Sequence, residues 1–71
     1  MSFTFTIEEY SPKSFVVRGD TKRFKEELKK LRGRYNPHLT NGPGWIFSKR
    51  RQEEIRTAIG EMKVSYIWKY Y

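Results

Sequence analysis

The apolar residues of this chain fall into short segments with two different periods, and this pattern constrains the fold more than any other feature. Phe3, Phe5 and Ile7 alternate with threonines, which predicts a half-buried strand. Within residues 21–32 the apolar side chains recur at i, i+4 and i+7 instead, which predicts a helix with one buried stripe. Short strands mixed with short helices in 71 residues indicate one α+β domain, residues 1–71.

The same periods, with turn and capping residues between them, predict the order ββαβαβ. Asp20 or Thr21 is expected to cap the first helix, Gly33 to be the left-handed residue after it, and Ser48 to cap the second. Residues 34–44 are rich in turn formers. The expected elements are strands at 3–7 and 15–18, a helix at about 21–32, a strand at 45–47, a helix at about 49–60 and a strand in 63–71.

The last segment also permits a second interpretation, because its apolar residues could continue the helix through Met62 and Tyr66. Its β-forming residues and Gly60 favour the strand. We therefore expect two helices on one face of a small, mostly antiparallel sheet. The predicted core comprises Phe5, Ile7, Phe15, Val17, Phe24, Leu28, Leu31, Ile46 or Phe47, Ile55 and Ile59.

The composition limits how such a small domain is held together. The chain has no cysteine, so neither a disulfide nor a thiolate metal site can stabilise it. Aromatic residues make up 17% of the chain, and each ring buries a large area. The aromatic side chains therefore have to supply much of the core, and a few are left for binding.

Positive charge is concentrated in two patches. The net charge is +7, and ten of the fifteen lysines and arginines lie either between Lys22 and Arg34 or in Lys49-Arg50-Arg51. Two glutamates, Glu26 and Glu27, cannot neutralise the first patch. Charge clustered in this way predicts contact with a polyanion, and nucleic acid is the first choice.

Aromatic residues beside these patches could stack on bases. Tyr35 follows the first patch, and Trp45 precedes the second and is expected either in the core or partly exposed. No base-reading pattern is present, so we expect weak sequence preference. The predicted nucleic-acid-binding residues are Lys22, Arg23, Lys25, Lys29, Lys30, Arg32, Arg34, Tyr35, Trp45, Lys49, Arg50 and Arg51.

Residues for catalysis or metal binding are not arranged in any familiar way. His38 is the only histidine, and without cysteines it has no convincing metal-binding partners. No spacing of serine, histidine and aspartate suggests a triad, and the Gly42-Pro43-Gly44 turn lacks the context of a phosphate-binding loop. We expect a non-enzymatic protein with no cofactor and no metal.

Two segments resemble a small domain found in proteins of large DNA viruses, with relatives in phage and plasmid proteins. They are Leu28-x-x-Leu31-Arg32-Gly33-Arg34-Tyr35-Asn36-Pro37-x-Leu39 and Gly42-Pro43-Gly44-Trp45-Ile46-Phe47-Ser48-Lys49. The family pattern is L-x-x-L-G-G-x-[WY]-N-x-x-L followed by G-W-I-F and a basic residue, so Arg32 stands where the pattern has glycine. The similarity spans residues 14–59. It implies a viral or mobile-element source and brings no catalytic residues.

The expected partner and location follow from these observations. No apolar run approaches the roughly 18 residues of a membrane span, and residues 1–10 do not resemble a secretory signal. We expect an intracellular protein, in the host cytoplasm or nucleus, or a virion protein, as a monomer or weak homodimer. DNA is favoured as partner, including single strands. The alternatives are a protein-interaction module that binds an acidic partner and a structural virion component.

Overall fold

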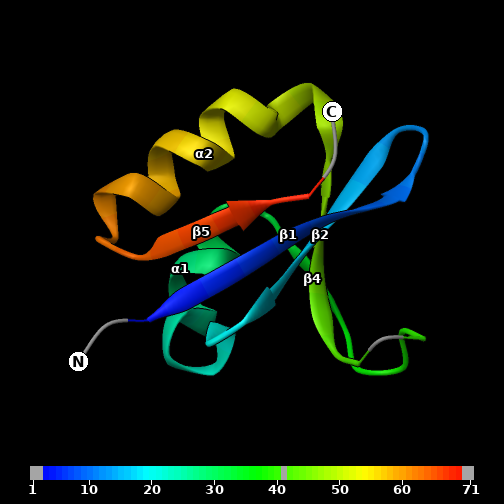
Figure 1. Ribbon diagram of the computed structural model, residues 1–71, viewed down its shortest axis with the longest axis horizontal. Coiled ribbons are helices and arrows are strands. Elements are labelled where there is room, and N and C mark those ends of the chain that lie inside the picture. The colour runs from blue at the N-terminus through cyan, green and yellow to red at the C-terminus, as the bar shows by residue number, and fades with distance from the viewer. Residues whose placement is uncertain (1–2, 41, 70–71) are drawn as a thin grey trace.

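The computed structural model describes residues 3–40 and 42–69, and its centre is a five-stranded mixed sheet (Figure 1). The strand order is β3-β4-β2-β1-β5. Three neighbouring pairs are antiparallel, and β5 pairs with β1 in parallel. The strands are β1 (Thr4–Ser11), β2 (Ser14–Gly19), β3 (Arg34–Asn36), β4 (Gly44–Ser48) and β5 (Ser65–Trp68).

Two helical segments connect strands that run in the same direction. Because β3 and β2 both run antiparallel to β4, they are parallel to each other, and the same reasoning makes β4 parallel to β5. Such connections have to cross a face of the sheet, and a helix usually makes the crossing. Here the crossings are η1 (Thr21–Phe24) with α1 (Lys25–Lys30), and η2 (Lys49–Arg51) with α2 (Gln52–Glu61). Both predicted helices are present, and each begins with a 3₁₀ turn.

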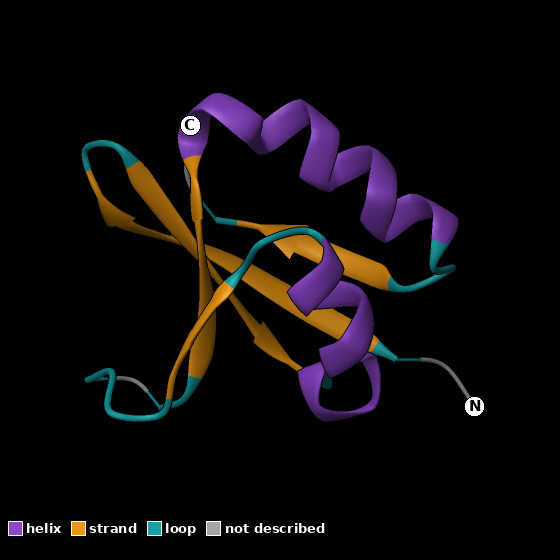
Figure 2. Ribbon diagram, turned by 180° about the vertical axis from the view of Figure 1, so that it is seen from behind, coloured by secondary structure: helices purple, strands orange, loops and turns teal. Residues whose placement is uncertain are grey.

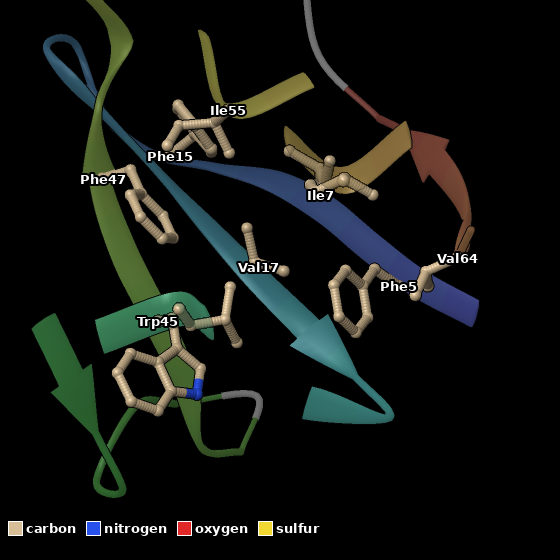
Figure 3. Packing of buried hydrophobic residues seen from close by; sticks show 10 residues of the cluster. Phe5, Ile7, Phe15, Val17, Trp45, Phe47, Ile55 and Val64 are labelled. Carbon is tan, nitrogen blue, oxygen red and sulfur yellow. The ribbon is translucent and has the colours of Figure 1, made fainter. Parts of the chain in front are cut away.

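Both helices cover the same face of the sheet, as predicted (Figure 2). Leu28 of α1 and Ile59 of α2 are fully buried in one cluster with the inward side chains of the strands. Figure 3 labels several of these strand residues, among them Phe5, Ile7 and Val17. Alternation along β1 explains which of its side chains join the core, because Phe5 and Ile7 point inward and the threonines outward. The buried apolar residues are Phe5, Ile7, Phe15, Val16, Val17, Leu28, Trp45, Phe47, Ile55, Ile59 and Val64.

Most of the predicted core is confirmed, with a few differences in detail. Phe24 and Leu31 are only partly buried and pack against the edge of the cluster. Phe47 is the buried residue of the Ile46–Phe47 pair. Trp45 is also buried, with 5% of its surface exposed, which decides between the two environments expected for it. Val64 completes the core next to β5.

β3 is the one strand that the sequence analysis missed. Arg34–Asn36 was assigned to the turn-rich segment, but it pairs antiparallel with β4. A segment of three residues with no apolar alternation carries no local strand signal; its neighbour β4 supplies the hydrogen bonds that make it a strand. The tail strand is confirmed at Ser65–Trp68, and residues 70 and 71 of the predicted segment lie outside the described residues.

Of the three predicted helix-end residues, Ser48 has its predicted role, whereas Asp20 and Gly33 do not. Ser48 caps the second helix, because its Oγ accepts the Arg50 N–H at 3.2 Å. Asp20 stands at the N-cap of η1 but makes no cap hydrogen bond there. Its carboxylate instead accepts the Thr4 N–H at 3.0 Å, which fastens the helix start to β1.

The second difference is at the end of α1, where Arg32 and not Gly33 is the left-handed residue. Arg32 has φ +67°, and its N–H donates to the Lys29 carbonyl at 2.9 Å. The Gly33 N–H donates to the Leu28 carbonyl at 3.0 Å, which completes a Schellman motif. Glycine at position 33 serves packing instead, because a Cβ there would lie 2.6 Å from the Phe47 ring.

Candidate nucleic-acid interface

Three of the predicted lysines line one wall of a groove beside the sheet. Lys22, Lys25 and Lys29 are spaced at i, i+3 and i+7 along η1 and α1, so they share one side of the helical segment. The opposite wall comes from the β3–β4 end of the sheet. We call this hollow of about 510 Å³ the aromatic groove; its lining residues are Gly19, Thr21, Lys22, Lys25, Lys29, Tyr35, Pro43 and Trp45.

The opposite wall is aromatic because Tyr35 and Trp45 are directly paired across β3 and β4. Their ring centroids are 5.2 Å apart, with the ring planes tilted by 50°. The indole is buried in the core, whereas 53% of the Tyr35 surface is exposed. Trp45 therefore supports the phenol ring from the inside, and Tyr35 is the ring that a ligand can reach.

The end of β2 fixes the lysine wall relative to the sheet. Gly19 has φ +108°, and a Cβ there would lie 2.4 Å from the Thr4 carbonyl oxygen, so only glycine fits this close passage. Asp20 binds Thr4 through both its backbone N–H and its carboxylate. Because these contacts hold the residues just before Lys22, the lysines start from a defined point next to β1.

The charge in the groove is not neutralised by the protein. None of the residues that line it is acidic. Within the described part of the chain, Lys22, Lys25 and Lys29 form no ion pair. Three ammonium groups on one wall attract an anionic ligand that lies along the helical segment.

Two predicted lysine and arginine residues of the same segment lie away from the groove. Arg23 places its guanidinium over the Phe3 ring, 5.1 Å from the centroid. Lys30 lines a separate hollow between the two helices, together with Glu27 and Glu61. The helix therefore divides the first basic run among three directions.

A second basic surface surrounds the end of β4. We call it the hairpin-end patch; its cations are Lys13, Arg32, Arg34, Lys49, Arg50 and Arg51. They line two hollows, of about 430 and 350 Å³, which share Lys13 and Ser48. Lys13 is not among the binding residues predicted from the sequence. It sits in the β1–β2 turn, and only the strand pairing brings it close, with its carbonyl accepting the Lys49 N–H at 2.9 Å.

Two cations of the hairpin-end patch already have acidic partners. Lys49 forms an ion pair with Glu9, and Arg51 contacts Glu54 at 2.7 Å. Arg51 also donates to the Leu31 carbonyl at 2.5 Å. The hydrogen bond with Glu54 raises the pKa of Arg51 and lowers the pKa of the Glu54 carboxyl. Lys13, Arg34 and Arg50 form no ion pair within the described residues. Arg32 acts on Glu54 only at longer range, where its positive charge adds to the lowering of the carboxyl pKa.

The remaining observations concern metals and membranes. Among residues 3–40 and 42–69, no three histidine, cysteine or carboxylate side chains come close enough to share a metal ion. His38 uses its backbone N–H to donate to the Asn36 side chain at 2.8 Å, which makes a tight turn after β3. Over the same described residues, no helix has the length and apolar character needed to cross a membrane.

The aromatic groove thus combines lysines that form no ion pair within the described chain with an exposed ring, and the hairpin-end patch adds further cations toward the opposite end of β4. Comparisons of this chain with protein-family models, with curated proteins and with solved structures found no match.

Proposed function

We propose that this domain binds nucleic acid without catalysing a reaction. The observation that carries the proposal is the aromatic groove, in which three lysines that form no ion pair with any described residue lie opposite an exposed tyrosine. Ammonium groups bind phosphate oxygens, and aromatic rings stack on bases, so the two walls match the two chemical parts of a polynucleotide. None of the described residues that line the groove is asparagine, glutamine, arginine or acidic, and the scarcity of such base-reading side chains supports weak sequence preference.

The hairpin-end patch is the second contact region in this proposal. Lys13, Arg34 and Arg50 are exposed cations of this patch that form no ion pair within the described chain. A ligand that contacts three phosphates in the groove alone should show a slope of about −2 in log K against log salt for a single strand. Contact with three further cations at the patch should steepen that slope to about −4.

Removal of the groove lysines should weaken binding specifically. We expect K22Q/K25Q/K29Q to lower affinity for the preferred nucleic acid roughly 10- to 100-fold at about 100 mM salt, and to make the salt dependence shallower. The measurement is fluorescence anisotropy with labelled single-stranded DNA, double-stranded DNA and RNA, titrated from about 50 to about 300 mM salt.

The matched control is K30Q/K63Q/K69Q, which removes three exposed lysines that do not line the groove. Both triple variants change the net charge from +7 to +4, because each loses three lysines. Equal weakening by the two variants would show that overall charge, and not the groove, determines binding. Absence of binding to all three ligands at about 100 mM salt would overturn the proposed function.

The biological setting belongs to the same proposal. A nucleic-acid-binding role is consistent with action inside a host cell or a virion, and with the resemblance of residues 14–59 to a domain of large DNA viruses. A partner protein with an acidic surface would meet the same cations, and it is tested as a competitor below.

A further inference from the structure

The aromatic groove is large enough to accept one flat ring. Its volume of about 510 Å³ lies within the range of roughly 300–1,000 Å³ typical of small-ligand pockets. Tyr35 lines the groove, is 53% exposed as a whole residue, and is backed by the buried indole of Trp45. A ring that stacks on Tyr35 would therefore rest on a rigid support, because the core holds the indole in place.

The lysine wall is placed to hold the backbone of the same ligand. From Lys22 to Lys29 the helical segment rises by about 10 Å, so the three ammonium groups are spread along a line instead of meeting at one point. A single small anion would use only one or two of them. A chain with repeated phosphates can use all three while one of its bases turns toward Tyr35.

Only an unpaired base can make this contact. In a duplex both faces of each base are covered by neighbouring base pairs, and the ring would have to leave the stack at a cost of a few kcal/mol. A single strand has no paired base to open, so its bases can rotate toward an aromatic side chain. The pairing of a lysine row with one exposed ring therefore selects for single strands.

We propose that the aromatic groove binds single-stranded nucleic acid, with one unpaired base stacked on Tyr35 and the flanking phosphates held by Lys22, Lys25 and Lys29. This inference rests on the proposed function and names its substrate class and its stacking residue. Because Trp45 is buried, it supports the Tyr35 ring and does not contact the base.

A comparison of two ligands with several variants tests the stacked base. The ligands are a labelled dT oligonucleotide of about 12 residues and an oligonucleotide of equal length in which every base is absent, so both carry the same phosphates. Wild-type protein should bind the dT oligonucleotide roughly 5- to 150-fold more tightly than the abasic one. Y35A and Y35L should bind the two ligands about equally, whereas Y35F should keep the wild-type preference.

The variants also separate stacking from charge. K22Q/K25Q/K29Q should weaken binding of both ligands to a similar extent, because both retain their phosphates. Thermal unfolding of each Tyr35 variant serves as the folding control, and Y35L keeps an apolar contact with Trp45 where Y35A loses it. The preference of Y35F over Y35L then reports the ring itself.

The outcomes distinguish this inference from the proposed function. Equal binding of dT and abasic ligands by wild-type protein would refute base stacking and leave nucleic-acid binding standing. The stacking inference would also fail if a duplex of equal length bound as tightly as the single strand. Displacement by polyglutamate as effective, per charge, as displacement by unlabelled dT would point to an acidic protein partner. Binding to duplex DNA but to neither oligonucleotide would refute this inference alone. Absence of binding to single-stranded DNA, double-stranded DNA and RNA would remove the proposed function itself.

Discussion

Two basic residues close the helices of this domain in left-handed backbone conformations. Arg32 follows α1, and Lys63, with φ +60°, follows α2. The end of α2 has the same hydrogen-bond pattern as the end of α1. The Lys63 N–H donates to the Gly60 carbonyl at 3.1 Å, and the Val64 N–H donates to the Ile59 carbonyl at 3.5 Å. Left-handed backbone is strained for any residue with a Cβ, so both helix ends carry a local cost that glycine would remove.

Glycine at position 32 should therefore stabilise the domain. We expect R32G to raise the free energy of unfolding by about 0.5–1 kcal/mol, because the relief of strain exceeds the added freedom of the unfolded chain. Urea denaturation measures the change. R32A is the matched control, since it removes the same charge and keeps a Cβ, and equal stability of the two variants would contradict the explanation.

Gly33, the next residue, is needed for a different reason. A Cβ at this position would lie 2.6 Å from the Phe47 ring and 3.1 Å from the Leu28 carbonyl oxygen. The ring is buried and cannot move away without disturbing the core. The loop after α1 thus passes close to β4 only because residue 33 has no side chain.

Alanine should have opposite effects at two glycines. We expect G33A to lower the free energy of unfolding by about 1–3 kcal/mol through overpacking against Phe47. G60A should raise it by about 0.5–1 kcal/mol, because Gly60 lies in α2 and, apart from its neighbours and the backbone of its own helix, no atom lies within 4 Å of the added methyl group. Thermal or urea unfolding of the two variants provides the test, and a loss of stability in both would show that the Phe47 contact is not the cause.

At the scale of elements, Arg51 joins the two helical segments. It belongs to η2, directly before α2, and its guanidinium donates to the Leu31 carbonyl at the end of α1. Glu54, one turn further along α2, holds the other side of the guanidinium. A carbonyl left without an intrahelical partner is thereby satisfied by a cation, and this charge also suits the negative end of a helix dipole.

Loss of this link should destabilise the domain, whereas the same substitution at the exposed neighbour Arg50 should have little effect on stability. We expect R51A to lower the free energy of unfolding by about 1–2 kcal/mol, because a charge-assisted hydrogen bond to a helix end is lost. R50A is the control, since Arg50 is exposed and bonds Ser48 through its backbone N–H only. Urea denaturation of both variants measures the difference. Similar losses from the two substitutions would rule out the linking role.

Local periodicity predicted those strands and helices whose apolar side chains recur at a regular spacing. β1 was predictable because Phe5 and Ile7 are separated by threonine, and the stripe through Leu28 identified the first helix. β3 was not predictable, because Arg34–Asn36 becomes a strand only through its pairing with β4. Nor does any local pattern reveal that β5 pairs in parallel with β1, since the partners are about sixty residues apart.

At the scale of the whole molecule, the candidate site was only half visible in the sequence. The phase of the first helix already places Lys22, Lys25 and Lys29 on a common side. Their proximity to Tyr35 depends on β3, whose existence the sequence did not reveal, and on strand order. Lys13 joins the hairpin-end patch for the same reason, through the pairing of β2 with β4.

The parallel pairing of β1 with β5 also bears on how the domain is made. Thr4 lies opposite Ser65 and Ile7 opposite Trp68, so the outer edge of β1 has no partner until residues 65–68 are available. During synthesis these residues are the last of the sheet to leave the ribosome. The nascent chain therefore exposes the unpaired outer edge of β1 until β5 has left the ribosome. Only then can β5 pair with β1 and complete the five-stranded sheet.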